Sequence, residues 1–323
     1  MIEVEHLTKR YAGHTAVDDL SFTVERGEIV GFLGPNGAGK STTMRILACF
    51  LPATSGRAKV AGFDVFSQSL EVRRHIGYLP ENVPLYPEMR VTEYLDYRAA
   101  LKGLSGRRLR ERVGAVKELT DIKDVENKII GKLSKGYRQR VGLAESMVHE
   151  PDLLILDEPT IGLDPNQIRQ VRDMIKNLGS RHTILLSTHI LPEVEMTCSR
   201  VIIINKGRIA AADTPANLPG KLRSAGNIRL ETDPGADDAV AELRKVPGVK
   251  EVTSILLEHD SAALGAPTEN GYREFELRVE AGADPRAEIF QLAVARHWKL
   301  RELSQRKATL EDVFVEITHA DAE

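Results

Sequence analysis

The sequence lacks most of the features that mark secreted or membrane-spanning proteins. Its 323 residues include only two cysteines, Cys49 and Cys198, whose spacing matches no metal or redox motif. We expect each to be a small buried side chain. The opening MIEVEHLTKRY lacks the apolar core of a signal peptide, and the longest apolar runs are far shorter than the roughly 20 residues of a membrane span. These absences favour a cytosolic protein.

An excess of charge of one sign is also missing. Lys and Arg total 44 and Asp and Glu total 47, a formal net charge of -3, so no basic excess indicates binding to nucleic acid. Hydrophobic residues at 42% and charged residues at 28% are typical of a globular protein. The length favours two domains over one.

Apolar strands alternate with helical patterns over about the first 218 residues. Short strands are expected over 1–33, a helix follows Lys40, and a largely helical, arginine-rich stretch runs from about 68 to 130. The segments DLLILDEP, HTILLSTH and RVIIINKG read as strands separated by helices. This alternation predicts an α/β core with a largely parallel sheet covered on both faces.

The pattern changes after a segment rich in turn-forming residues near 213–221. The segments that follow read as strand, helix, strand, strand, helix and strand, which is the split βαβ, ferredoxin-like order. An exposed loop is expected at 259–270, and TLEDVFVEITHA reads as a last helix. We therefore predict a first domain at 1–218, with a helical subdomain at about 85–145, and an accessory α+β domain at 219–323.

A complete phosphate-binding loop lies between the strand GEIVGFLG and a helix. The pattern G-x-x-x-x-G-K-[ST] is formed by Gly34, Pro35, Asn36, Gly37, Ala38, Gly39, Lys40 and Ser41. The glycines let backbone N–H groups face a phosphate, and the helix N-terminus adds partial positive charge. We expect Lys40 to bridge the β- and γ-phosphates of a nucleotide and Ser41 to ligate Mg²⁺. The alternative is a glycine turn before a structural helix.

Three further features follow the loop in the sequence. The apolar strand LLIL ends in Asp157 and Glu158, which we expect to hold Mg²⁺ through water and to polarise an attacking water, respectively. His189 ends the strand TILLST and is either a γ-phosphate contact or an ordinary histidine. Ser134 can cap a helix and Gly136 permits close approach, so YRQRVGLAESMV begins either at a second anion site or at an ordinary cap.

In this order and spacing, over residues 1–219, the motifs resemble the ATP-binding cassette (ABC) family, the ATPase subunits of ABC transporters. The resemblance implies the P-loop NTPase fold of the cassette, ATP and Mg²⁺ as cofactors, and Lys40, Glu158 and His189 as catalytic residues. The residues that it implies for ATP contacts outside the glycine loop's first eight positions are Tyr11, Val17, Thr42 and Glu81, and those around the metal are Ser41, Asp157 and Glu81. The implied signature motif consists of Leu133, Ser134, Lys135, Gly136 and Tyr137. The implied D-loop consists of Gly162, Leu163 and Asp164.

The resemblance further implies a head-to-tail pair of cassettes, either a homodimer or a heterodimer with a paralogous cassette. Each signature helix would then cover the ATP held by its partner. Glu81 stands where the family usually has Gln, and it keeps an oxygen for Mg²⁺ or its water but adds charge. Lys135 and Tyr137 replace the commoner Gly and Gln, which adds bulk but leaves Ser134 and Gly136 in place. Ile161 replaces Ser at the start of the D-loop, and we expect this change to weaken contacts between subunits.

The C-terminal ATLEDVF, from Ala308 to Phe314, is similar to the SLEDVF-like ends of ATPases that serve ABC-2-type exporters of the gliding-motility, multidrug and copper-enzyme maturation type. The resemblance implies a subunit on the cytoplasmic face of the cell membrane that powers a permease on a separate chain. The insert at about 90–130 either docks on that permease, with Glu81 and the 82–90 loop relaying the nucleotide state, or is a solvated amphipathic face.

Two rival functions remain. A soluble cassette ATPase that acts on ribosomes or DNA would be expected to carry two cassettes, a coiled coil or basic extensions, and the sequence shows none of these. A regulatory protein that binds ATP without turnover would be expected to lack Glu158 or His189, and both are present.

Overall fold

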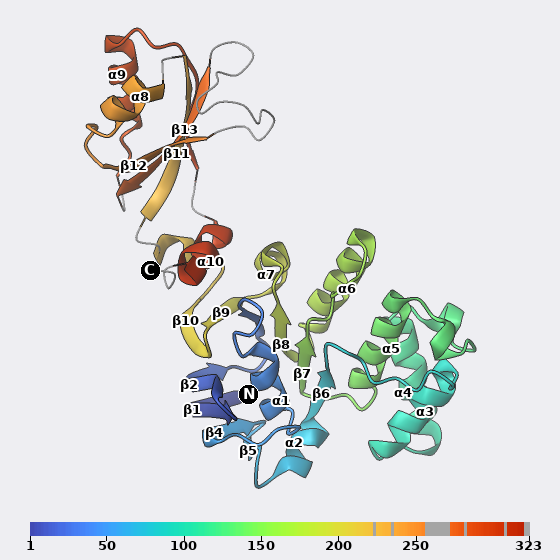
Figure 1. Ribbon diagram of the computed structural model, residues 1–323. Helices are drawn as coiled ribbons and strands as arrows, with labels where there is room; N and C mark the ends of the chain where they lie inside the picture. Colours follow the sequence, from blue (N-terminus) through green and yellow to red (C-terminus); the bar gives the residue numbers. More distant parts are fainter. Residues whose placement is uncertain (222–223, 234–235, 256–271, 281–282, 307–308, 320–323) are drawn as a thin grey trace. The chain divides into compact units, whose positions relative to one another are not determined.

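The chain divides into two compact units, Met1–Pro215 and Ala216–Glu323, in the computed structural model (Figure 1). The described residues are 1–221, 224–233, 236–255, 272–280, 283–306 and 309–319. The loop expected at 259–270 and Ala308 of the C-terminal motif lie outside the described residues.

A six-stranded sheet is the framework of the first unit. Its order is β10 (Arg208–Asp213), β9 (Arg200–Asn205), β3 (Ile29–Leu33), β8 (Thr183–Thr188), β7 (Leu153–Asp157) and β6 (Ile76–Leu79). All neighbours are parallel except β10, which is antiparallel to β9. Every residue of β7 and β8 is buried, as expected for central strands covered on both faces.

A second, antiparallel sheet packs beside the first. Its order is β2 (His14–Val24), β1 (Ile2–Tyr11), β4 (Ser55–Val60) and β5 (Phe63–Asp64). One hydrophobic core joins both sheets to helix α1 (Lys40–Leu47), with Leu20 from β2, Phe32 and Ile202 from the first sheet, and Met44 from the helix. Helix α1 is thereby held against both sheets at the point where the glycine loop ends.

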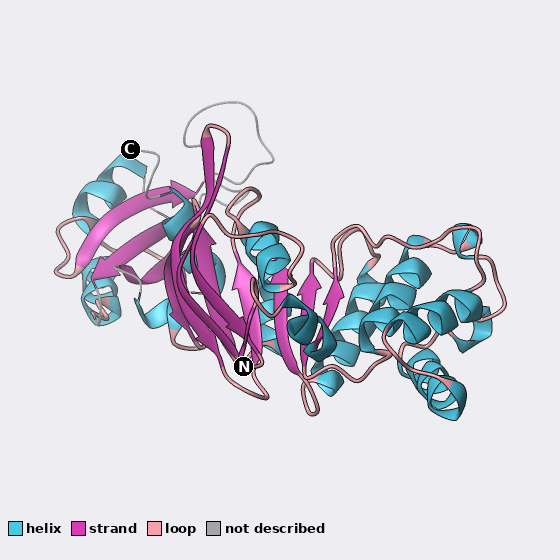
Figure 2. Ribbon diagram, turned by 90° about the horizontal axis from the view of Figure 1, so that it is seen from below, coloured by secondary structure: helices cyan, strands magenta, loops and turns pink. Residues whose placement is uncertain are grey.

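Helices cover the six-stranded sheet and form a group at one side of the first unit (Figures 1 and 2). Those in this group are α3 (Val91–Leu101), α4 (Gly106–Leu119) and α5 (Lys135–Met147), which pack on one another, with the short turns η1 (Lys123–Val125) and η2 (Ile130–Lys132) between α4 and α5. The others are α2 (Ser69–His75), α6 (Pro165–Leu178) and α7 (Leu191–Thr197). Within the described ranges, no helix combines the length and apolarity of a membrane span.

The expectation of a helical stretch from about 68 to 130 is wrong at Ile76–Leu79, which forms strand β6. Four residues are too few to show a period, and helical patterns flank them on both sides. The strand forms because Ile76 pairs in parallel with Leu153 of β7 and extends the sheet. Tertiary pairing therefore decides the local structure at this position.

The second unit is a four-stranded antiparallel sheet with two helices packed on its core. Its order is β12 (Val249–Ile255), β13 (Arg273–Glu280), β11 (Ser224–Thr232) and β14 (Leu300–Arg306). The helices are α8 (Ala236–Leu243) and α9 (Arg286–Ala295), and a turn η3 (Leu218–Lys221) lies against a last helix α10 (Leu310–His319). The strand order is that of the split βαβ arrangement.

The boundary between the units yields the first prediction. Leu218 is fully buried, and its turn η3 contacts α10, so these residues belong with the second unit. A chain ending at Pro215 should remain soluble, unfold in one cooperative thermal transition and bind nucleotide, because every expected nucleotide contact precedes this residue. A chain ending at Gly220 is the matched comparison and should aggregate more readily, since it exposes Leu218. If the shorter chain is soluble but binds no nucleotide, part of the site lies in the second unit.

Candidate functional site

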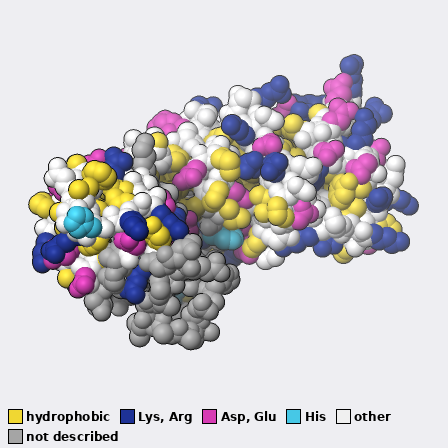
Figure 3. Space-filling model, turned by 90° about the horizontal axis from the view of Figure 1, so that it is seen from above, with side chains coloured by type: hydrophobic (Ala, Val, Ile, Leu, Met, Phe, Trp, Pro, Cys, Tyr) yellow, Lys and Arg dark blue, Asp and Glu magenta, His cyan; other side chains and the backbone are white. Residues whose placement is uncertain are grey.

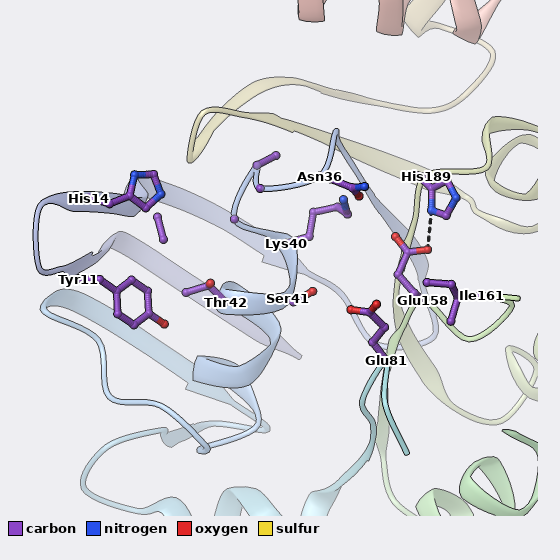
Figure 4. Close-up of a pocket in the computed structure, with 14 residues that line it drawn as sticks. Tyr11, His14, Asn36, Lys40, Ser41, Thr42, Glu81, Glu158, Ile161 and His189 are labelled. Atoms are coloured by element: carbon purple, nitrogen blue, oxygen red, sulfur yellow. Dashed lines mark hydrogen bonds and ion pairs between the residues drawn. The ribbon is translucent and has the colours of Figure 1, made fainter. Parts of the chain in front are cut away.

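A pocket of about 700 Å³ lies beyond the carboxyl ends of β3, β6, β7 and β8 (Figure 4). Of the residues predicted from the sequence, those that line it are Tyr11, Asn36, Gly37, Ala38, Gly39, Lys40, Ser41, Thr42, Glu81, Glu158 and His189. His14, Ala16 and Ile161 line it as well. In a parallel sheet, this edge is where ligands bind.

The glycine loop is tightly fitted to the hairpin that precedes it. Gly39 has a φ of +105°, and a Cβ at this position would lie 2.4 Å from the carbonyl oxygen of Ala16. A side chain here would therefore clash with the backbone and would also occupy the left-handed region that favours glycine. Because Gly39 immediately precedes α1, this close approach sets where the helix N-terminus points.

Lys40 lies across the loop with its ammonium group among oxygen atoms. Its Nζ donates hydrogen bonds to the carbonyl oxygens of Gly34 at 2.7 Å and Pro35 at 3.1 Å. Burial lowers the pKa of Lys40, while the negative charges of Glu158, Asp157 and Glu81 act in the opposite direction. The ammonium is thus a desolvated cation beside the pocket, and an anion that entered would gain a strong electrostatic partner.

Asp157 is fully buried at the end of β7, and only one of its two oxygens is satisfied. Oδ1 accepts hydrogen bonds from Ser41 Oγ at 3.1 Å and from Ser187 Oγ at 2.6 Å. Oδ2 has no hydrogen-bond partner within the described part of the chain. A buried carboxylate oxygen without a partner costs about 1–3 kcal/mol, or more when charged. The side chain is therefore arranged to accept one further donor or a cation.

Glu158 and His189 meet at the mouth of the pocket, as the dashed line in Figure 4 shows. His189 Nδ1 lies 2.8 Å from Glu158 Oε2, and the side chain of Glu158 is 7% exposed whereas that of His189 is 50% exposed. The backbone N–H of Glu158 donates to Ser187 Oγ at 2.9 Å, and its φ of +49° turns the chain sharply after β7. The glutamate is thus held rigidly beneath a histidine that faces the opening.

Tyr11 and Val17, two of the residues expected to contact ATP, lie in different environments. Tyr11 is half-exposed at the rim of the pocket, with Lys9 Nζ 5.3 Å from the centre of its ring. Val17 is fully buried and does not line the pocket, because it packs behind Gly39. Ala16, the preceding residue, lines the pocket instead.

The signature residues pack against the D-loop, and none of Gly162, Leu163 and Asp164 lines the pocket, although Ile161 just before them does. None of Ser134, Lys135, Gly136 and Tyr137 lines it. A Cβ on Gly162 would lie 2.0 Å from Lys135 Nζ, and a Cβ on Gly136 would lie 2.6 Å from Gln167 Oε1, so the start of α5 packs directly against the D-loop and α6. Asp164 caps α6 by accepting hydrogen bonds from the backbone N–H groups of residues 166 and 167 at 3.0 Å.

Sequence reasoning missed several polar residues around the pocket. His14 lines it opposite Tyr11 in the β1–β2 hairpin, and Ser187 holds Asp157 and Glu158 as described above. Glu193 is buried on α7, where burial raises its pKa. Ser187, two positions before the candidate histidine, could have been found from its proximity in the sequence. Nothing in the local pattern distinguishes Glu193 from an ordinary helical glutamate.

Together, the glycine loop with its buried lysine, the half-satisfied aspartate and the glutamate–histidine pair define a P-loop nucleoside triphosphatase of the cassette type. The profile of the family described as "ABC transporter" matches residues 17–161. The solved "Structure of ATP binding subunit of ABC transporter" is 32% identical, covers 68% of this chain and 91% of its own, and superposes with a TM-score of 0.62.

Three curated relatives extend the comparison. The uncharacterized ABC transporter ATP-binding protein YxlF of Bacillus subtilis is 41% identical, over 99% of this chain and 100% of its own length. The daunorubicin/doxorubicin resistance ATP-binding protein DrrA of Streptomyces peucetius is 35% identical, over 98% and 92% of the two chains. The probable multidrug ABC transporter ATP-binding protein YbhF of Escherichia coli is 37% identical over 75% of this chain, but the match spans only 41% of the length of YbhF.

The chain belongs to the ATP-binding proteins of ABC transporters, and it is an ATPase of that family. The cassette fold expected from the sequence is thereby confirmed for the first unit.

The geometry at Glu158 yields the second prediction. Glu158→Gln keeps the shape of the side chain but removes the carboxylate that can polarise water, so turnover of ATP should fall at least about 10²-fold, a typical loss for a general base. Binding of ATP should persist, because Lys40 and the glycine loop are unchanged. Phosphate release and nucleotide binding measure the two effects. Glu5→Gln, at an exposed position on β1, is the control and should hydrolyse ATP normally. Normal turnover by Glu158→Gln would reduce Glu158 to a structural cap.

Proposed function

We propose that this chain binds and hydrolyses ATP, with the residues named below, to power an ABC-2-type membrane permease on a separate chain, and that the transporter is an exporter. The observation that carries the catalytic part is the pair formed by Glu158 and His189, which faces the loop containing Lys40 across one pocket. The names of DrrA and YbhF, which refer to drug resistance and to multidrug transport, support export. The protein would then lie on the cytoplasmic face of the cell membrane.

The residues near Ser41 fit a magnesium ion. The unsatisfied Oδ2 of Asp157 and the hydroxyl of Ser41 are both oxygen donors, which Mg²⁺ prefers, and the ion retains several waters of its own. Glu81, which lines the same pocket, can accept a hydrogen bond from such a water. When bound, the ion neutralises charge on the β- and γ-phosphate oxygens.

The other residues divide the work of hydrolysis. Lys40, now paired with carbonyl oxygens of its own loop, would turn to the β- and γ-phosphates, and the backbone N–H groups of the loop and the start of α1 would hold the β-phosphate. Glu158 would accept a hydrogen bond from the attacking water. His189 would contact the γ-phosphate while its Nδ1 stays within hydrogen-bond distance of Glu158 Oε2. Tyr11 would stack on adenine at the rim.

The position of the signature residues supports a head-to-tail pair of cassettes. Ser134 and Gly136 lie at the N-terminus of α5, a place suited to an anion, yet they do not line the pocket of their own chain. A second cassette would bring its α5 to this pocket and its own pocket to this α5. Each ATP would then lie between one glycine loop and the signature residues of the other chain.

A mixing experiment tests this arrangement. Lys40→Ala removes the cation of the glycine loop, and Ser134→Arg blocks the signature helix, so each protein alone should be inactive. In a mixed pair, both changes fall in one composite site and the other site is intact, so hydrolysis should partly recover after subunit exchange. ATP-dependent dimerisation should be followed as well, because coupling between sites could hide the recovery. If mixed pairs form and neither measure recovers, the signature helix serves its own chain.

We propose that the permease docks near the C-terminal end of α3. Phe50 and Leu101 are 66% and 61% exposed. The structure links their surroundings, because Lys102 Nζ donates to the carbonyl oxygen of Arg73 at 3.3 Å and Arg73 donates to that of Cys49 at 2.7 Å. Two exposed apolar side chains thus lie on segments held together by hydrogen bonds, and they would suit an apolar segment of a membrane protein.

The loop that precedes α3 connects this surface to the pocket. Tyr86, in the 82–90 loop, packs on the ring of Tyr97 on α3 at 5.9 Å between centroids, and the loop begins directly after Glu81. A shift of Glu81 on binding or loss of the γ-phosphate would therefore reach the surface through this loop. This is the relay expected from the sequence.

The arginines of α4 suit a solvated face better than a docking surface. Arg107 pairs with Glu111 at 2.6 Å, and Arg112 pairs with Glu150 at 3.0 Å, so their charges are matched within the chain. Figure 3 shows basic and acidic side chains interspersed on the face it presents. Of the two interpretations of the 90–130 insert, the docking role therefore belongs to α3 and its preceding loop.

Leu101→Glu tests the docking surface. A charge in place of this exposed apolar side chain should reduce the share of the protein that sediments with host-cell membranes, while ATP hydrolysis by the purified protein stays near the wild-type rate. Leu119→Glu on α4, also an exposed leucine, is the matched control and should leave sedimentation unchanged. Equal sedimentation of both variants and the wild type would exclude this surface as the docking site.

A further inference from the structure

Glu193 occupies an unusual position for a glutamate. It is 4% exposed on α7, and its Oε2 accepts hydrogen bonds from Thr160 Oγ1 at 3.1 Å and from Thr188 Oγ1 at 3.2 Å. Its Oε1 has no hydrogen-bond partner among the described residues. Burying a carboxylate with so few partners is costly, so an apolar residue of similar size would make the more stable helix. The residue calls for a role other than stability.

The two threonines that Glu193 holds are the neighbours of functional segments. Thr188 is the last residue of β8 and immediately precedes His189. Thr160 follows Glu158 and Pro159 and immediately precedes Ile161, which lines the pocket, and the D-loop. One carboxylate oxygen therefore joins the start of the histidine loop to the start of the D-loop, 28 residues apart in the sequence (188 − 160).

Thr188 also clamps the backbone on the far side of the histidine. Its Oγ1 accepts a hydrogen bond from the N–H of Ile190 at 3.0 Å while its proton is donated to Glu193. The residues on both sides of His189 are thus fixed by one hydroxyl group. Without the acceptor on Glu193, that hydroxyl would be free to rotate, and the backbone around His189 would be held less firmly.

Helix α7 is itself anchored to the strand that leads into the glycine loop. A Cβ on Gly31 of β3 would lie 3.0 Å from both Val194 Cγ1 and Cys198 Sγ, so the helix packs directly on this strand. Glu193 is adjacent to Val194 and shares this anchor. The phosphate-binding strand, the histidine loop and the D-loop are therefore connected through one helix.

We propose that Glu193 is a positioning residue that holds His189 and the D-loop in fixed relation to the glycine loop through its hydrogen bonds to Thr188 and Thr160. The proposal rests on the function proposed above for Glu158 and His189. Glu193 touches no substrate, and its effect passes through His189 and the segment that begins at Ile161. Loss of the hydrogen bonds should therefore slow the chemical step and leave ATP binding by the glycine loop intact.

Three variants of the full chain separate this role from packing and from charge. Glu193→Leu fills the same space without an acceptor and should lower kcat about tenfold or more, as expected for a residue that orients a catalytic group. The KM for ATP should stay within about twofold of the wild type, since substrate binding is unchanged. Glu193→Gln keeps an oxygen for both threonines and should retain at least about half of the wild-type kcat. Glu195→Leu, exposed on the same helix, is the control and should behave as the wild type.

The outcomes distinguish the alternatives. A wild-type kcat in Glu193→Leu overturns the proposal, because the hydrogen bonds of Glu193 would then have no role in turnover. An equal loss of kcat in Glu193→Leu and Glu193→Gln also overturns it, because the charge of Glu193 and not its hydrogen bonding would then be responsible. A raised KM with unchanged kcat overturns it as well. If Glu193→Leu does not fold, Thr188→Val keeps the shape of the side chain but removes the hydrogen bonds of Thr188 Oγ1 to Glu193 and from the N–H of Ile190, and an undiminished kcat there also overturns the proposal. Lys40→Ala and Glu158→Gln, measured alongside, test the function itself: if they hydrolyse ATP normally, the failure lies with the proposed site and not with Glu193.

Discussion

The parallel pairing of β7 with β8 is the interaction on which the site depends. Its register sets Asp157 opposite Ser187, and the pairing of β8 with β3 sets Thr188 opposite Leu33, one residue before the glycine loop begins. The loop, the acidic pair and the histidine therefore leave the sheet at one edge. Because side chains alternate between the faces of a strand, a shift of one residue would direct Asp157 and Ser187 to opposite sides and break their hydrogen bond.

The features that the sequence predicts well are those whose chemistry lies within a few consecutive residues. The glycine loop is one segment, so its residue types alone indicate a phosphate site, and the strand before Asp157 carries its own apolar pattern. His189 is different. A single histidine shows no local pattern, so the sequence leaves its role open, and only the sheet register brings it to Glu158, 31 positions earlier in the chain. Glu193 could not be identified at all, because both of its partners are set by tertiary packing.

The same distinction explains the fold. Alternation in β13, with Phe275 and Leu277 buried between more exposed neighbours, is visible in the sequence and predicts this strand. The four residues of β6 show no such period, and only their pairing with β7 makes them a strand. The resemblance implies that Val17 contacts ATP, but the hairpin turns its side chain into the core behind Gly39. Its neighbour Ala16 lines the pocket instead.

The departures from the family pattern can be judged by where their side chains lie. Lys135 adds bulk to the signature motif, but its ammonium rests against Gly162 of its own D-loop, so the added atoms occupy space within the chain. Gly136 still keeps Gln167 close to the backbone of α5, and Ser134 still caps the helix. The features on which the proposed anion site at this helix end depends are therefore present. Ile161 lines the same pocket as Glu158, and its apolar side chain cannot exchange hydrogen bonds with a partner as a serine could. The D-loop of this chain is held by contacts within the subunit, because Lys135 lies against Gly162 and Glu193 accepts a hydrogen bond from Thr160, the residue before Ile161.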